Sequence, residues 1–109
     1  MRIVNLEEFR KMPSGTIYRK YEPCSFGDIC VKHDTWEYDF LYQDLIDFEA
    51  DDSGDYVNMC DKMVSGESVA ISFDTVSRDG LFEKNQMFLI LEKEDVKALY
   101  NFIGDLLAE

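Results

Sequence analysis

The sequence predicts one α+β domain over residues 1–109, built on an antiparallel sheet of about five strands with helices packed on one face. The length of 109 residues is typical of a single domain. Apolar residues make up 46% of the chain and aromatic residues 14%, which is enough to build a core. Segments that alternate with a period of two are interleaved with segments of helical spacing, in the order helix, three strands, helix, two strands, helix.

The first predicted helix covers residues 5–12. Asn5 is a favourable N-cap residue, and Glu8 stands three residues later, as in a capping box. Pro13 ends this helix, because proline has no backbone N–H to continue it. The turn that follows leads into a first strand at residues 16–22, which are rich in β-forming residue types.

A hairpin and a long strand are expected next. Gly27 marks a turn, and residues 29–35 form the return strand. Residues 36–49 show the clearest alternation in the chain, with aromatic residues on one parity and most acidic residues on the other. A strand of this length is unusual, so we expect a bend near Asp44, the one acid on the aromatic parity.

The second half begins with a second helix, capped by Asp52 or Ser53 and ending before Gly66, a residue suited to the position after a helix. Residues 68–76 alternate again and predict a fourth strand.

A turn at residues 78–80 follows, and residues 87–91 are apolar on both faces, which predicts a central strand. The last helix is expected over residues 94–107, because its apolar residues recur at helical spacing.

The charge of the chain is concentrated in one segment. The net charge is −12, from 11 Lys and Arg against 23 Asp and Glu, and residues 34–61 hold ten acids and no Lys or Arg. This balance excludes direct nucleic-acid binding through phosphate neutralisation and argues against docking on an anionic membrane. No apolar run approaches the ~20 residues of a spanning helix, and the N-terminus does not fit a signal peptide. We therefore expect a cytoplasmic protein.

No motif points to catalysis, a cofactor or a metal. The three cysteines, Cys24, Cys30 and Cys60, lack the close pair that zinc sites use, and we interpret them as free thiols in a reducing compartment. The stretch that begins at Glu49 resembles part of an EF-hand loop but has Cys60 where a bidentate Glu is required. His33 is the only histidine, and no phosphate-binding loop is present. We expect a protein without enzymatic activity.

The acidic segment, residues 34–61, is the first candidate binding surface. On a strand, carboxylates of one face stand about 6.8 Å apart, and such a row repels itself when no local base neutralises it. Interleaved aromatic side chains would anchor a basic partner that the charge steers. The alternative is a solvated face that keeps the chain soluble. The residues expected to bind the partner are Trp36, Glu37, Tyr38, Asp39, Tyr42, Asp44, Asp47, Glu49, Asp51 and Asp52.

A basic and aromatic cluster is the second candidate. Its tyrosines could stack on a nucleobase and its cations could pair with a phosphate, although such cations also discourage pairing at a sheet edge. Arg19 and Lys20 point to opposite faces of a strand, so one pocket uses both only at a twisted edge or a subunit interface, which implies an oligomer. The residues of this cluster are Tyr18, Arg19, Lys20, Tyr21, Lys32 and Arg78.

The chain opens with the run Asn5-Leu6-Glu7-Glu8-Phe9-Arg10-Lys11-Met12-Pro13-Ser14-Gly15-Thr16-Ile17-Tyr18, followed by Lys20-Tyr21-Glu22-Pro23 and Phe26-Gly27-Asp28. This opening is similar to small acidic accessory proteins encoded by tailed bacteriophages. Many of these bind and block a host defence protein, and some sequester a nucleotide signal.

The resemblance and the acidic segment together favour a counter-defence inhibitor that acts in the host cytoplasm. We expect it to mimic nucleic acid and to bind the basic, nucleic-acid-binding surface of a host defence protein. The alternative is an oligomeric sponge for a nucleotide immune signal, which would use the basic and aromatic cluster. The resemblance transfers no functional residue.

Overall fold

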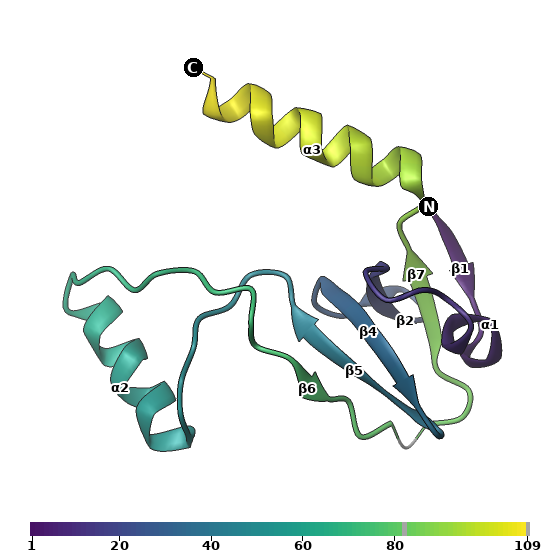
Figure 1. Cartoon of the computed structure of the whole chain (residues 1–109), viewed down its shortest axis with the longest axis horizontal. Coiled ribbons are helices and arrows are strands. Elements are labelled where there is room, and N and C mark those ends of the chain that lie inside the picture. The colour runs from purple at the N-terminus through teal and green to yellow at the C-terminus, as the bar shows by residue number, and fades with distance from the viewer. Residues whose placement is uncertain (82, 109) are drawn as a thin grey trace.

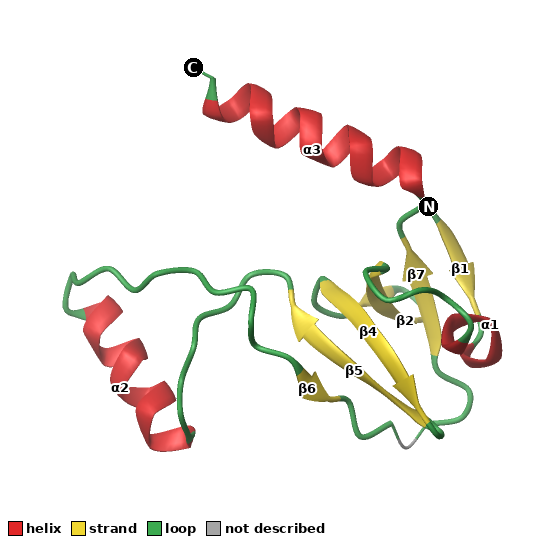
Figure 2. Cartoon of the chain, in the orientation of Figure 1, coloured by secondary structure: helices red, strands yellow, loops and turns green. Residues whose placement is uncertain are grey.

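The computed structural model describes residues 1–81 and 83–108, which contain seven strands and three helices (Figures 1 and 2). In chain order they are β1 (Arg2–Val4), α1 (Leu6–Arg10), β2 (Ile17–Glu22), β3 (Ser25–Phe26), β4 (Cys30–Trp36), β5 (Asp39–Asp44), α2 (Ser53–Val64), β6 (Ser77–Arg78), β7 (Met87–Ile90) and α3 (Lys93–Leu107).

The strands form one antiparallel sheet in the order β1-β7-β2-β4-β5-β6, with β3 paired to β2. The predicted α+β class is confirmed. The expected number of about five strands is too low, because β1, β3 and β6 contain only three, two and two residues. Strands this short leave no alternating pattern in the sequence.

The core lies between one face of the sheet and α1. Phe9 of α1 is fully buried, and its ring stacks on that of Phe88 with centroids 3.8 Å apart. Tyr18 and Phe40 approach the Phe9 ring edge-on, at 4.8 Å and 5.1 Å. Asn5 caps α1 as predicted, since its side chain accepts a hydrogen bond from the backbone N–H three residues later. Burial of these four rings is the main apolar contribution to the fold.

The other two helices do not cover the sheet. None of the residues Ser53–Val64 of α2 or Lys93–Leu107 of α3 is buried, and both helices project from the sheet in Figure 1. The radius of gyration is 15.8 Å, above the ~13 Å of a compact domain of this length. The expectation that the helices pack on one face is therefore wrong for α2 and α3, because the apolar face of each remains outside the core.

Helix α2 begins where the sequence predicts, and α3 begins at Lys93, one residue before its predicted start. Asp52 caps α2, with its side chain accepting from the N–H of Asp55 at 2.7 Å, and Glu92 forms a capping box with Asp95 at the start of α3. Gly66 follows α2 with φ of 97°, as expected for the residue after a helix. The beginning and end of each helix depend on local capping, which does not require a packed face.

The expected long strand at residues 36–49 is divided by a tight turn. Trp36 ends β4 and pairs with Asp39, the first residue of β5, while Glu37 between them takes φ of 54°. Residues that pair across a hairpin share a face, so the aromatic parity changes sides at this turn. The bend expected near Asp44 is the end of β5.

Residues 68–76 do not form the strand that their alternation predicts. Ser72 makes a single isolated bridge with Asp47, and Ile71 and Phe73 are exposed rather than turned inward. A strand needs a ladder partner, and Asp47 already lies beyond the end of β5. The short strand β6 pairs with β5 instead, and its second residue is Arg78, the start of the expected turn.

Candidate functional site

An acidic groove with a volume of about 530 Å³ lies between the segment before α2 and the segment after it. Three of its carboxylates, those of Asp47, Glu49 and Asp51, come from the loop that connects β5 to α2. The fourth belongs to Asp74, in the loop between α2 and β6. The groove therefore combines two loops that the sequence separates by a whole helix.

Two aromatic rings form part of the groove wall. The ring of Phe48 stacks on that of Tyr56, in the first half of α2, with centroids 5.0 Å apart and planes within 20° of parallel. A stacked pair of this kind offers a flat π surface, which attracts a cation placed over it. The acidic groove thus places carboxylates and an aromatic surface within reach of one ligand.

Ser72 holds the two loops together. Its backbone N–H donates to the carbonyl of Asp47 at 2.9 Å, and its hydroxyl donates to Glu49 Oε1 at 3.0 Å. The same hydroxyl accepts from the N–H of Asp74 at 3.2 Å, which positions that residue at the groove. Sequence reasoning missed Asp74, because an isolated bridge between two loops leaves no periodic signal.

The groove carboxylates form no ion pair with the part of the chain that the structure describes. None of the ion pairs found in residues 1–81 and 83–108 includes Asp47, Glu49, Asp51 or Asp74. Carboxylates that face one groove without a counter-charge repel each other. Among the described residues, no three metal-ligating side chains converge on one point.

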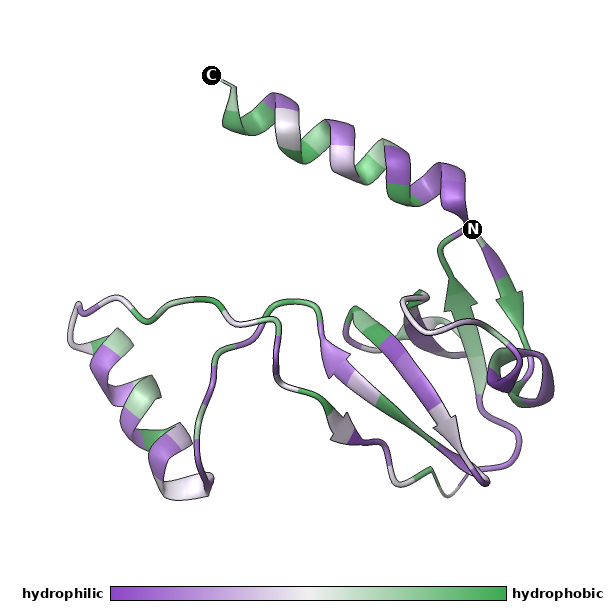
Figure 3. Cartoon of the chain, in the orientation of Figure 1, coloured by the Kyte–Doolittle hydropathy of each residue, from purple (hydrophilic) through white to green (hydrophobic). Residues whose placement is uncertain are grey.

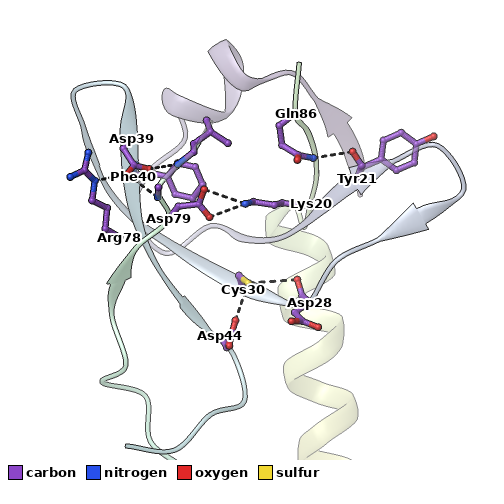
Figure 4. A network of polar contacts seen from close by, with 12 residues as sticks. Lys20, Tyr21, Asp28, Cys30, Asp39, Phe40, Asp44, Arg78, Asp79 and Gln86 are labelled. Carbon is purple, nitrogen blue, oxygen red and sulfur yellow. Dashed lines mark hydrogen bonds and ion pairs between the residues drawn. The ribbon is translucent and has the colours of Figure 1, made fainter. Parts of the chain in front are cut away.

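Asp39 does not belong to an exposed acidic surface, contrary to the sequence-based expectation. It is 5% exposed, and its carboxylate accepts hydrogen bonds from Arg78 Nε at 2.6 Å and from the N–H of Gly80 at 2.9 Å (Figure 4). Burial by itself would raise the pKa of Asp39. The Arg78 guanidinium and the backbone N–H groups of Phe40, Leu81 and Gly80 outweigh that effect and lower the pKa. This carboxylate therefore holds the fold together.

The residues predicted to bind a partner at the tip of the β4–β5 hairpin lie beside arginine side chains. The guanidinium of Arg78 is 4.6 Å from the centroid of the Trp36 ring, and that of Arg10 is 5.9 Å from the Tyr38 ring. Glu37 lies between the two aromatic residues, in the turn. The hairpin tip thus combines acidic, basic and aromatic side chains, and it shares no residue with the acidic groove.

The other predicted partner-binding residues have local roles. Asp44 accepts from the Cys30 thiol at 3.4 Å, and Tyr42 is half-buried beside the core. Asp52 caps α2. Of the ten residues expected to bind a partner, Asp47, Glu49 and Asp51 come together in the acidic groove.

The basic and aromatic cluster is largely dispersed. Tyr18 and Lys20 line one pocket of about 270 Å³, but Asp28, Asp44 and Asp79 line it too, so it is not suited to an anion. Tyr18 and Lys32 are each 1% exposed, and Lys32 Nζ donates to the carbonyls of Met12 and His33. Burial lowers the pKa of Lys32, although the charge of nearby Asp34 partly opposes this. Neither side chain presents a polar group to a ligand at the surface.

The remaining bases of that cluster are engaged with groups of the chain itself. Lys20 Nζ pairs with Asp79 at 2.9 Å (Figure 4), and Arg78 pairs with Asp39. Arg19 Nε donates to a backbone carbonyl, that of Gly27, at 2.8 Å. Its guanidinium and the Tyr21 ring both contact Phe26, on the face of β2 opposite Tyr18. These residues do not form one anion-binding pocket.

Comparison of the chain with protein-family models, with curated proteins and with solved structures returned no match. A bilayer-spanning helix is not found in the described residues, where none combines the required length and hydropathy. The geometry of the acidic groove is therefore the basis for assigning a function.

Proposed function

We propose that this chain is a non-enzymatic binding protein that engages a basic surface of a partner protein through the acidic groove. One observation carries the proposal: four carboxylates, none of them in an ion pair with another described residue, line the same groove as a stacked aromatic pair. A guanidinium group fits such a site, because it pairs with carboxylates in its plane and stacks on aromatic rings through its face. The net charge of −12 would in addition steer a basic partner toward the chain.

The resemblance to phage accessory proteins suggests which basic surface this is. We propose that the partner is a host defence protein and that the groove engages its nucleic-acid-binding surface. Such surfaces present Arg and Lys side chains to phosphates, and carboxylates on a second protein satisfy the same cations. Occupation of that surface would exclude nucleic acid and so inhibit the defence protein.

A short arginine-rich peptide tests the groove directly. We expect the neutralised variant Glu49→Gln/Asp51→Asn/Asp74→Asn to bind the peptide at least about tenfold more weakly, because each desolvated ion pair contributes on the order of 1 kcal/mol. The matched control is Glu7→Gln/Glu22→Gln/Glu94→Gln, which removes the same charge from exposed sites on other elements. Titration calorimetry gives the affinities, and NMR shifts of the Phe48 and Tyr56 rings locate the peptide.

The control distinguishes a site from general attraction. If both variants lose affinity equally, the peptide responds only to net charge and the groove has no special role. The physiological partner is then sought by capture from defence-carrying cells, with wild type and the neutralised groove variant compared side by side. We expect a protein that wild type retains, that the variant loses and that duplex DNA displaces. Failure of DNA to compete would exclude the nucleic-acid-binding surface as the target.

A further inference from the structure

The helix α3 carries an apolar face that continues past the part of the helix nearest the sheet. Val96 and Leu99, in its first half, are half-buried. In its second half the exposed fractions are 77% for Tyr100, 60% for Phe102, 54% for Ile103, 57% for Leu106 and 85% for Leu107. Figure 3 shows hydrophobic segments recurring along α3 out to its free end. The same face that begins against the sheet is therefore uncovered further along.

An uncovered helix of this kind needs a partner. A helix of 15 residues is marginally stable in water, and packing of its apolar face normally supplies the missing stability. No residue from Lys93 to Leu107 is buried, so the chain itself does not supply this packing.

We propose that a second copy of this chain covers the face, with α3 against α3 in a two-fold symmetric dimer. The residues Val96, Leu99, Ile103 and Leu106 follow the spacing three, four, three, which is the seam of a helix that packs along another helix. Because both copies carry the same seam, one two-fold axis pairs the two faces and closes the assembly.

The distribution of charge favours a second copy over a basic partner at this face. Residues 98–104 contain no charged side chain, although the chain as a whole is strongly acidic. Packing this segment on its own copy buries no unpaired charge.

The available area is sufficient. From their exposed fractions, the five uncovered side chains present on the order of 600 Å² per copy, since a fully exposed aromatic side chain offers about 150–250 Å². Complete burial of these side chains in both copies would remove about 1,200 Å² from water as an upper bound, compared with the roughly 1,000 Å² expected of a specific interface. A groove of about 690 Å³, lined by Ile17, Leu91, Val96 and Tyr100 among others, borders the same helix and adds apolar surface.

Sedimentation of the full chain tests the dimer. We expect wild type to approach 25.4 kDa, twice the 12.7 kDa of one chain, as its concentration rises. Ile103→Glu places a charge within the seam, so it should weaken dimerisation at least about tenfold. The matched control is Gly104→Glu, which adds the same charge one residue further, where a Cβ atom would meet no atom within 4 Å apart from its chain neighbours and its own helix backbone. This control should retain the wild-type affinity within about twofold.

Three results would contradict an α3–α3 dimer. A wild-type chain that stays monomeric up to about 1 mM overturns the proposal, since even a weak specific dimer forms there. Equal weakening by Ile103→Glu and Gly104→Glu also overturns it. Binding of the monomer to neutral phosphatidylcholine vesicles would assign the face to a lipid surface instead.

If Ile103→Glu fails to fold, Leu106→Ser takes its place, because Leu106 is largely exposed in one copy. The arginine peptide should bind Ile103→Glu as it binds wild type, so the dimer and the acidic groove are tested independently.

Discussion

Arg78 donates a hydrogen bond from Nε to Asp39 Oδ2 at 2.6 Å, joining the short edge strand β6 to the first residue of β5 (Figure 4). The two side chains differ in environment, since that of Asp39 is 7% exposed and that of Arg78 is 59% exposed. Of the two groups, the Asp39 carboxylate is therefore the one that must be stabilised by hydrogen bonds within the protein. It also accepts from backbone N–H groups that follow β6, so it anchors the whole return of the chain to the sheet.

Replacement of this carboxylate should destabilise the fold. We expect Asp39→Asn to lower the free energy of unfolding by about 2–3 kcal/mol, because one acceptor oxygen becomes an NH₂ group that faces N–H donors. Glu37→Gln, an equivalent change at an exposed residue of the adjacent turn, should have an effect within about 0.5 kcal/mol. Urea denaturation followed by circular dichroism measures both. Equal stability of Asp39→Asn and wild type would contradict the anchoring role.

The Asp39 carboxylate should also give the fold a distinct pH dependence. Its pKa is lowered in the folded protein, so the native state holds the proton less tightly than the unfolded chain does. Its contribution to stability is therefore fully present above the ordinary pKa of about 3.9 and is lost as the pH falls through the lower folded value. The stability difference between wild type and Asp39→Asn should stay constant from about pH 7 to pH 5 and narrow below about pH 4. A constant difference at all pH values would be inconsistent with the lowered pKa.

The stacked ring of Phe9 should be critical for the core. Phe9→Ala removes a fully buried ring that contacts three other rings, and we expect a loss of about 3–5 kcal/mol. Phe73→Ala makes the same chemical change at a side chain that is 59% exposed, and it should cost less than about 1 kcal/mol. Thermal unfolding of the two variants compares them. Similar transition temperatures would mean that α1 does not close the core.

The cysteines should differ in reactivity. Burial, together with the hydrogen bond to Asp44, raises the pKa of the Cys30 thiol to about 12, whereas Cys24 is exposed. The thiolate is the reactive form, so in the native protein near pH 8 a maleimide should label Cys24 quickly and Cys30 only upon unfolding. Peptide mapping after timed labelling distinguishes the sites. Labelling of native Cys30 at the rate of Cys24 would show that the core opens readily.

Local signals in the sequence predicted much of the secondary structure. The Asn5 cap, the Asp52 cap, the β-forming residues of β2 and the apolar run of β7 all act over a few residues, so their outcomes could be predicted without knowledge of the fold. The concentration of acids in residues 34–61 was equally visible, because charge is a property of composition.

The tertiary structure decided which side chains share a surface. Alternation across residues 36–49 suggested one face, but the turn at Glu37 exchanged the two faces and buried the Asp39 carboxylate, which pairs with the exposed Arg78. A two-residue hairpin reverses the chain without interrupting the alternating pattern, so the pattern does not reveal it.

The acidic groove depended on the tertiary structure for a further reason. Asp74 joins Asp47 and Glu49 through the hydrogen bonds of a single serine, Ser72, located in a segment that sequence analysis had assigned to a strand. Contacts between loops arise from where the chain returns, and no local preference encodes that position. The sequence by itself therefore determined the helices, the main strands and the excess of acid. Only the fold determined which acids are buried, which of them line the groove, and which apolar helix faces remain free to bind another molecule.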